Sequence, residues 1–275
     1  MADFSLEDLK TLRERLGTGM VDSKNALVEA GGDLEKATEI LRLKGAKSNA
    51  KRSDRSTSEG LVGAVESATA TTLIELACET DFVAKSDKFI ALGNTVLQAL
   101  ADSGAETVDM ALATKVGSGT VESTISDEAA ILGEKIELRR LARIPGDKFA
   151  VYLHRTSKDL PPQVGVVVAF QGEDADTIRS VAQHISFADP QYLSRDEVPA
   201  DIVENERRIV EEISRGEGKP DAALPKIVEG RVSAFFKQVA LLDQDYAKDN
   251  KVSVGKVLSD AGVKVTGFAR FKVGA

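Results

Sequence analysis

The stretch Cys78-Glu79-Thr80-Asp81-Phe82-Val83-Ala84-Lys85 connects a predicted strand to a predicted helix, and the rest of the chain is organised around it. Before it, residues 71–78 carry apolar side chains at every second position, which is typical of a strand. After it, residues 89–100 carry apolar side chains three and four positions apart, which indicates a helix. Ser86 or Asp87 can cap the N-terminus of this helix. The connection between the two contains neither glycine nor proline.

Phe82 lies in this connection at a position that neither periodicity assigns to a core. Connections usually lie at the surface, where a large aromatic side chain is out of place unless something receives it. One interpretation is that Phe82 caps the junction and folds back onto the sheet. The other is that it is exposed and contacts a partner. The physical argument alone favours the first interpretation.

The composition is that of an ordinary globular protein. With 275 residues, 42% of them hydrophobic and 29% charged, the chain suits two or three modest units better than one large core. No apolar run approaches the ~20 residues that cross a bilayer. Met1-Ala2-Asp3-Phe4-Ser5 lacks the basic and apolar regions of an export signal. We therefore predict a cytoplasmic protein without membrane association.

The side chains that carry chemistry are few. A single cysteine, Cys78, excludes an intrachain disulfide, and its strand position predicts a buried small side chain rather than a nucleophile. The two histidines, His154 and His184, make a metal site improbable and belong to no recognisable nucleophile motif. Phosphate-loop and dinucleotide-binding motifs are missing. The sequence thus predicts no enzymatic activity, no metal and no cofactor.

The net charge of −8 argues against nucleic-acid binding, because contacts with phosphates require a basic face. Two small basic groups exist, which we interpret as part of a solvated linker and as the outward face of a strand. They are Lys47, Lys51, Arg52 and Arg55, and then Arg139, Arg140 and Arg143.

Residues 1–45 predict a bundle of three short helices that are separated or ended by glycines, the last of them Gly45. Ser5 and Asp8 match a capping box at the start of the first helix. The bundle resembles ubiquitin-associated domains, in which a Gly-Met loop between the first two helices commonly contacts partners. Met20 and Val21 can equally be buried between the helices, and for Val21 we favour burial. The polar residues 46–59 predict a flexible linker.

Residues 60–144 predict one α/β unit. Two strands over 61–66 and 71–78 precede the helix from about residue 87, and a short helix near 127–132 precedes a closing strand over 136–144. In this closing strand apolar and charged residues alternate. The apolar ones are Ile136, Leu138, Ala142 and Ile144, and the charged ones are Glu137, Arg139 and Arg143.

Residues 145–275 repeat the same order, which indicates an internal structural repeat. Strands are expected over 149–153 and 164–170, and a helix over 178–185. An antiparallel helical hairpin is inserted at about 196–240, and its apolar second arm must pack on something. A short helix over 253–261 and a last strand over 263–273 close the unit. The predicted fold class is α+β, with a three-helix bundle followed by two related α/β subdomains.

Three motifs together resemble one protein family. They are Thr80-Asp81-Phe82-Val83, an N-terminal run of Leu12-Arg13-Glu14-Arg15 with Gly19-Met20-Val21-Asp22-Ser23-Lys24 and Ala26-Leu27, and a C-terminal Val265-Thr266-Gly267-Phe268-Ala269-Arg270-Phe271. Their content and order are similar to those of the elongation factor Ts family. The motifs extend from one end of the chain to the other, which makes the resemblance specific.

This resemblance implies a guanine-nucleotide exchange factor for elongation factor Tu in translation elongation. Such a factor binds the GDP-bound and nucleotide-free forms of its partner and displaces Mg²⁺ through the loop Thr80–Val83. By position, Phe82 would be the wedge, Asp81 would orient the loop by hydrogen bonding, and Thr80 and Val83 would shape it. GDP release then allows GTP to bind.

The resemblance also implies partner contacts from Met20, Lys24, His154 and Val239. The chain departs from the family pattern after His154, where Arg155-Thr156-Ser157 stands in place of the usual glycines. The helical hairpin would serve docking, a homodimer or a 2:2 complex. The alternatives are a ubiquitin-associated-type adaptor that acts through residues 1–45 alone and an enzyme on the α/β core, for which the sequence offers no candidate residues.

Overall fold

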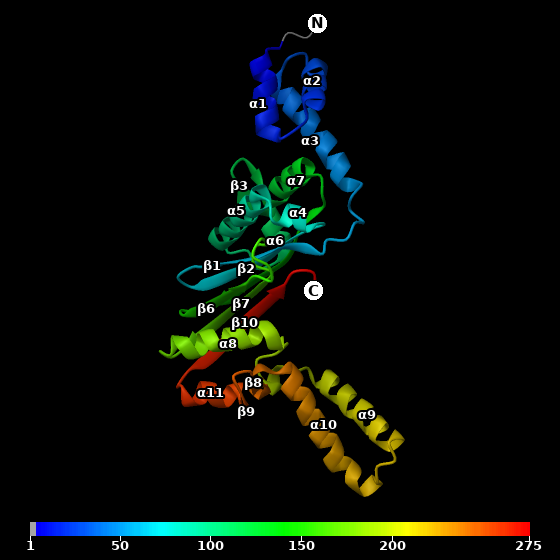
Figure 1. The fold of residues 1–275 in the computed structure, drawn as a ribbon, viewed down its shortest axis with the longest axis vertical. Helices are drawn as coiled ribbons and strands as arrows, with labels where there is room; N and C mark the ends of the chain where they lie inside the picture. The colour runs from blue at the N-terminus through cyan, green and yellow to red at the C-terminus, as the bar shows by residue number, and fades with distance from the viewer. Residues whose placement is uncertain (1–3) are drawn as a thin grey trace.

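The computed structural model describes residues 4–275 and shows three parts that follow one another along the long axis of the molecule (Figure 1). A helical bundle lies at one end, an α/β body in the middle and a helical hairpin at the other end. The first three residues of the predicted N-terminal segment lie outside this range. None of the helices in residues 4–275 has the length and apolar character that a membrane crossing requires.

The bundle contains three helices, as predicted, with a small core of leucine and alanine side chains. Its helices are α1 (Leu6–Leu16), α2 (Met20–Glu29) and α3 (Leu34–Ala50). The predicted capping box at the start of α1 is confirmed, because the Ser5 hydroxyl accepts a bond from the Asp8 amide at 3.0 Å and the Asp8 carboxylate accepts one from the Ser5 amide at 2.8 Å.

The prediction that α3 ends at Gly45 is wrong, since the helix continues to Ala50. Gly45 lies where α3 crosses α7 (Val121–Leu132), and a Cβ at this position would come within 2.9 Å of the Ala130 Cβ. The glycine therefore lets two helices approach closely instead of ending one of them. One turn later, the Asn49 side chain donates a hydrogen bond to the Ser126 carbonyl at 2.7 Å. The expected linker is accordingly shorter than predicted.

The body contains two antiparallel three-stranded sheets with the orders β1-β2-β5 and β10-β7-β6. In each unit a hairpin, a helix and a returning strand follow in the same order, with β2 and β7 as central strands, so the predicted repeat is confirmed. The strands are β1 (Glu59–Glu66), β2 (Ala70–Cys78), β5 (Ile136–Pro145), β6 (Phe149–His154), β7 (Val164–Gln171) and β10 (Lys264–Lys272).

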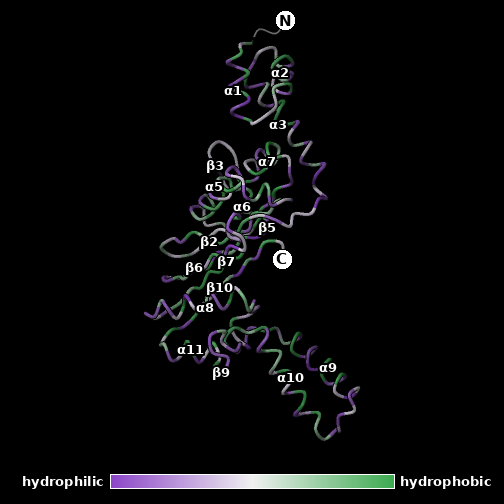
Figure 2. The backbone as a smooth tube through the Cα atoms, viewed as in Figure 1, coloured by the Kyte–Doolittle hydropathy of each residue, from purple (hydrophilic) through white to green (hydrophobic). Residues whose placement is uncertain are grey.

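The two sheets pack face to face and helices cover their outer faces (Figure 1). Val62, Leu73, Val167 and Val273 form the buried contact between the sheets. Figure 2 shows that hydrophobic and hydrophilic residues are mixed along the two helices of the hairpin. The covering helices are α4 (Asp81–Ala84), α5 (Asp87–Ser103), α6 (Val108–Ala113) and α7 on the first sheet, and α8 (Ala175–Ala188) and α11 (Val254–Asp260) on the second.

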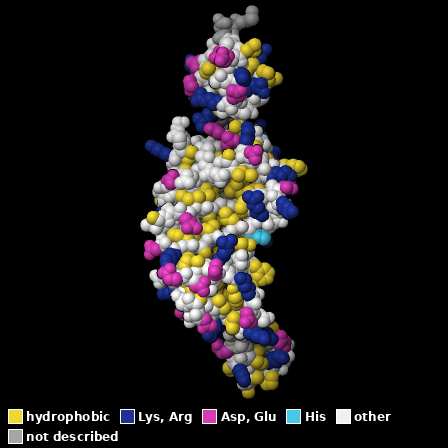
Figure 3. All heavy atoms as spheres, turned by 60° about the vertical axis from the view of Figure 1, so that its left-hand side comes forward, with side chains coloured by type: hydrophobic (Ala, Val, Ile, Leu, Met, Phe, Trp, Pro, Cys, Tyr) yellow, Lys and Arg dark blue, Asp and Glu magenta, His cyan; other side chains and the backbone are white. Residues whose placement is uncertain are grey.

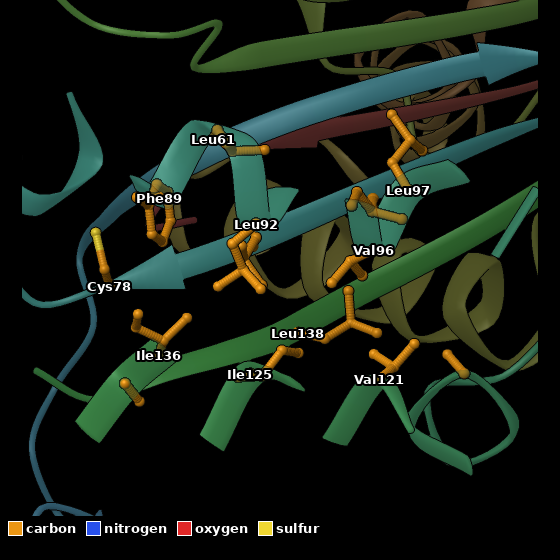
Figure 4. Packing of buried hydrophobic residues seen from close by; sticks show 14 of the residues in the cluster. Leu61, Cys78, Phe89, Leu92, Val96, Leu97, Val121, Ile125, Ile136 and Leu138 are labelled. Atoms are coloured by element: carbon orange, nitrogen blue, oxygen red, sulfur yellow. The ribbon is translucent and has the colours of Figure 1, made fainter. Parts of the chain in front are cut away.

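The core of the first unit lies between its sheet and its helices (Figure 4). Phe89 and Val96 of α5 point toward β1 and β2, and Ile125 of α7 points toward β5. Phe89 is fully buried, and burial of such an aromatic side chain contributes roughly 2–3 kcal/mol to folding. This core fixes the end of β2, from which the connection to α5 emerges.

The predicted alternation along β5 is interrupted by a bulge opposite Glu75 and Leu76 of β2. Ile136 and Leu138 consequently face the helices, whereas Ala142 and Ile144 face the second sheet.

The bulge also corrects the interpretation of the second basic group as a solvated strand face. Arg139 and Arg140 are both half-buried and both pair with Glu75, whose carboxylate is fully buried. The Gly274 amide donates a further bond to Glu75 at 3.2 Å. These residues form an ion cluster at the edge of the sheet-to-sheet contact, where a buried carboxylate requires such partners.

The hairpin of α9 (Ala200–Gly216) and α10 (Leu224–Val239) lies within the predicted range. Val210, Val228 and Val232 form a core between its two arms, so the apolar arm packs mainly on its neighbour.

Several short elements escaped prediction, and the helix expected near 127–132 begins earlier, at Val121. The missed elements are α6, β3 (Lys115–Val116), β4 (Gly119–Thr120), β8 (Asp245–Tyr246) and β9 (Asp249–Ser253).

Candidate partner-binding site

The connection after β2 forms a single helical turn, α4. Thr80 caps this turn, and its hydroxyl accepts a bond from the Val83 amide at 3.4 Å. Val83 and Ala84 are buried against the body, whereas Asp81 and Phe82 face outward. Val83 and Ala84 therefore anchor the turn to the body, and Asp81 and Phe82 face the solvent.

Phe82 is 73% exposed, so the interpretation that it folds back onto the sheet is wrong. Its ring contacts the Lys85 ammonium, which lies 4.4 Å from the ring centroid. Lys85 in turn pairs with Asp81 at 3.2 Å on the same turn. An exposed aromatic side chain held on a defined turn is typical of an anchor for another protein.

The base of the turn is held by a residue that the sequence analysis missed. Glu134, in the connection between α7 and β5, accepts bonds from the Glu79 and Thr80 amides, each at 3.0 Å, and from the Thr80 hydroxyl at 2.5 Å. Glu79 in return accepts a bond from the Lys135 amide at 2.6 Å. Nothing in the local sequence pattern pairs Glu134 with Thr80, because the contact depends on the pairing of β2 with β5.

Cys78 is buried below the turn, as predicted, and its thiol donates to the Thr80 carbonyl at 3.4 Å. Burial, together with the nearby Glu134 carboxylate, raises the pKa of the Cys78 thiol to about 12. A thiol that stays protonated is a poor nucleophile, so Cys78 supports the turn by packing.

The predicted contacts of the bundle lie on α2. Met20 is 53% exposed and Lys24 is exposed, so both can reach a partner. The prediction that Val21 is buried is wrong, since 70% of it is exposed. The helix instead turns Ala26 and Leu27, with Ser23, into the bundle core.

The remaining predicted contacts lie in the second unit. His154 is the exposed last residue of β6, and its Nδ1 lies 3.1 Å from the Tyr152 hydroxyl. Val239 is the half-buried last residue of α10, and its carbonyl accepts bonds from the Gln191 and Tyr192 amides.

The predicted contact residues do not form one cluster. They lie on α2, α4, β6 and α10, which are spread along the molecule (Figure 1). Figure 3 shows hydrophobic side chains gathered over the body on the face turned forward in that view. A set of contacts this extended suits a large protein partner better than a small ligand.

The described residues offer little for catalysis. Across residues 4–275 no group of histidine, cysteine, aspartate and glutamate side chains could hold a metal ion. His184 is buried and bonded to Gln244 at 2.9 Å, as expected for a structural histidine. The site thus consists of an exposed aromatic turn whose base is hydrogen-bonded to the body.

Comparisons with known proteins identify the family. The profile described as "Elongation factor TS" matches residues 79–275. The chain is 69% identical over 276 residues to elongation factor Ts of Leifsonia xyli and 70% identical over 275 residues to that of Clavibacter sepedonicus. That of Tropheryma whipplei is 55% identical over 274 residues. Each match covers 100% of both chains, and the chain belongs to the elongation factor Ts family.

This membership confirms the function that the three motifs implied. The protein is a nucleotide-exchange factor for elongation factor Tu in translation elongation, and it is not an enzyme. A match that covers the whole chain also argues against an adaptor that acts through residues 1–45 alone.

Proposed function

We propose that the turn Thr80–Val83 drives exchange by entering the nucleotide domain of elongation factor Tu and displacing its Mg²⁺. The observation that carries this proposal is the exposure of Phe82 on a turn whose base is hydrogen-bonded to the body. An apolar ring that protrudes into water gains free energy when a partner buries it. The hydrogen bonds to the body hold the turn, so that the Phe82 ring keeps a defined direction.

The Mg²⁺ ion of a guanine-nucleotide-binding protein offsets the charge of the phosphate oxygens and holds the nucleotide. Displacement of this ion weakens nucleotide binding without breaking a covalent bond. The effect is a coupling between two ligands and must be reciprocal, so nucleotide also expels the factor. The factor therefore binds both the GDP-bound and the nucleotide-free form of its partner. Because incoming nucleotide releases it, one molecule of the factor can act on many molecules of elongation factor Tu.

Each residue of the turn has a proposed role. Phe82 is the wedge, and Asp81 orients the turn by a hydrogen bond to the partner. The Asp81–Lys85 ion pair is largely exposed and contributes little to stability, so Asp81 can exchange it for a partner bond. Thr80 and Val83 shape the turn through the cap and the buried side.

Further contacts extend the interface. We expect Met20 and Lys24 to meet the partner from the bundle, and His154 and Val239 from the second unit. We expect no direct nucleic-acid contact, given the net charge of −8, and a cytoplasmic location, where translation takes place.

The hairpin is the proposed element for a homodimer or a 2:2 complex. Its arms bury the valines between them, but Ile213 remains 48% exposed on α9. Ile213→Asp should therefore leave the hairpin folded and lower the association constant of a dimer formed there. Sedimentation at several concentrations measures this, and an unchanged distribution of species in a protein that does dimerise would exclude Ile213 from the contact.

The test of the wedge compares two exposed phenylalanines. Phe82→Ala should slow the release of labelled GDP from elongation factor Tu at least tenfold, because a central aromatic anchor is worth ~2 kcal/mol or more. Phe187→Ala is the matched control, since Phe187 is 81% exposed on α8, away from the turn. Both variants should retain the denaturant midpoint of the parent protein. A Phe82→Ala protein that is destabilised but fully active would contradict the proposal.

A further inference from the structure

We infer that Glu134 is the positioning residue that aims the Phe82 turn, an inference that rests on the proposed function. Glu134 belongs to the connection between α7 and β5, far from the turn in sequence. Its carboxylate is nevertheless the acceptor for three donors at the base of the turn, two amides and one hydroxyl. No other side chain contributes as many hydrogen bonds to residues 79–83 among the described bonds.

The three donors need this acceptor because the sheet ends there. The pairing of β2 with β5 ends at Cys78 and Ile136, and beyond this pair the two segments of the backbone separate. The amides of Glu79 and Thr80 are left without a strand partner, and the Glu134 carboxylate accepts from both of them. A half-buried backbone amide without a partner is unfavourable, so the carboxylate decides which conformation this segment adopts.

The bond to the Thr80 hydroxyl links this acceptor directly to the turn. At 2.5 Å it is a short bond to an ionised group, of the kind that is stronger than a neutral bond. The same hydroxyl accepts from the Val83 amide, because a threonine hydroxyl can donate and accept at once. Glu134 therefore orients the cap of α4, and the cap sets the direction in which Phe82 leaves the body.

A second, reciprocal bond secures the junction. The Glu79 carboxylate accepts a bond from the Lys135 amide at 2.6 Å. Each of the two segments, the one after β2 and the one before β5, thus supplies a carboxylate that accepts from an amide of the other. Arg55, which precedes β1, lies 3.2 Å from both Glu79 oxygens and offsets the charge of this second acid. The arrangement holds the turn before a partner arrives, and such preorganisation lowers the entropy lost on binding.

The test uses a graded pair of substitutions. Glu134→Ala removes all three bonds and should lower the maximal rate of GDP release at least about fivefold, because the wedge is no longer held in its binding orientation. Glu134→Gln keeps an oxygen for the two amides and an NH₂ group for the Thr80 hydroxyl, so it should stay within about twofold of the parent. Glu122→Ala, an exposed acid on α7 with no bond to the turn, is the control and should have no effect.

A double-mutant cycle shows whether Glu134 acts through Phe82. The variant with both Glu134→Ala and Phe82→Ala should be no more than about twofold slower than Phe82→Ala alone, since a wedge that is absent cannot be misplaced. Multiplicative losses would overturn the inference. Full exchange by Phe82→Ala would instead contradict the proposed function, so the two failures are distinguishable. Loss of exchange in Phe82→Ala with parental activity in Glu134→Ala would overturn the inference alone.

Amide hydrogen exchange separates positioning from general support of the fold. In Glu134→Ala the amides of Glu79 and Thr80 should exchange at least about tenfold faster, while those of Leu73 to Ala77 in β2 keep their protection. Rescue of this protection by Glu134→Gln is expected. Uniform acceleration throughout β2 would assign Glu134 to the scaffold and overturn the inference.

Discussion

The two repeated units differ most in the connection that follows the central strand. In the first unit residues 79–86 join β2 to α5, and they form the turn that presents Phe82. In the second unit only residues 172–174 join β7 to α8. The framework of hairpin, helix and returning strand is the same in both. The difference shows that one framework can carry an exposed aromatic turn in one copy and a three-residue junction in the other.

The short connection of the second unit also begins with a residue that has no room for a side chain. Gly172 adopts a φ of 111°, and a Cβ there would come within 2.8 Å of the Gly262 carbonyl oxygen. The backbone at Gly172 is thus packed directly against the segment before β10, which excludes a side chain at this position. The longer connection of the first unit has no such neighbour above Phe82, so the exposed ring has access to a partner.

The largest effect on stability is expected for Phe89, which belongs to the framework and not to the connection. Phe89→Ala should lower the free energy of unfolding by about 3–5 kcal/mol, since it empties a fully buried site. Phe82→Ala should change it by less than about 0.5 kcal/mol. Denaturant unfolding of both variants measures the contrast. Similar losses in the two would mean that the turn is part of the framework after all.

A smaller loss is expected for Glu75, which distinguishes the central strand β2 from the uncharged β7. Glu75→Ala removes the buried partner of Arg139 and Arg140 and should cost about 2–4 kcal/mol, less than for fully buried pairs because both arginines are partly exposed. Unfolding in urea measures this cost. Arg207→Ala, which breaks an exposed ion pair with Glu229 in the hairpin, is the control and should leave the urea midpoint almost unchanged.

The sequence predicted the framework because periodicity reports directly on buried faces. The strands around Ile74 and Val167 and the helix around Phe89 follow from apolar spacing alone. Prediction from periodicity failed where a contact between residues distant in sequence determines the local structure. Gly45 lies inside a helix at its close approach to Ala130, and the bulge in β5 lies opposite Glu75 of another strand.

The residues of the candidate site were proposed from the motif, and their exposure and contacts could be predicted only in part. The motif identified Phe82 and its neighbours, but physical reasoning on the isolated segment favoured a buried ring. Only the paired strands bring Glu134 to Thr80, and no local pattern announces such a contact. The prediction for Val21 failed because this residue lies in the first turn of α2, where too few residues precede it for the apolar spacing to define a buried face.

A small effect is expected for Cys78, at the end of the first unit's central strand. Cys78→Ala removes one buried sulfur and should lower the free energy of unfolding by about 1 kcal/mol, with exchange of nucleotide unchanged. Since burial raises the pKa of the thiol to about 12, iodoacetamide at pH 8 should label the native protein far more slowly than the denatured one. Complete loss of exchange in a folded Cys78→Ala protein would give the thiol a direct role.

The smallest effect concerns His184, a buried titratable group on α8 that α5 of the first unit lacks. The Ala247 amide donates to its Nδ1 at 3.2 Å, so the neutral ring donates from Nε2 to Gln244. Burial lowers the pKa of His184 below its ordinary 6.5. The unfolded chain therefore binds a proton first as the pH falls through ~6.5, and the folded state loses stability from there down to its own lower pKa.

The contribution of neutral His184 to the free energy of unfolding is fully present above pH 6.5. Below that value it falls by no more than about 1.4 kcal/mol per pH unit. Other groups titrate in the same range, so the measurement is a difference between variants. His184→Gln should show a weaker fall in unfolding free energy between pH 7.5 and pH 5.5 than the parent. Phe187→Ala changes an exposed, non-titratable side chain on the same helix and should retain the parent's pH dependence. Equal slopes in all three proteins would mean that His184 gains its proton as readily in the folded state as in the unfolded one.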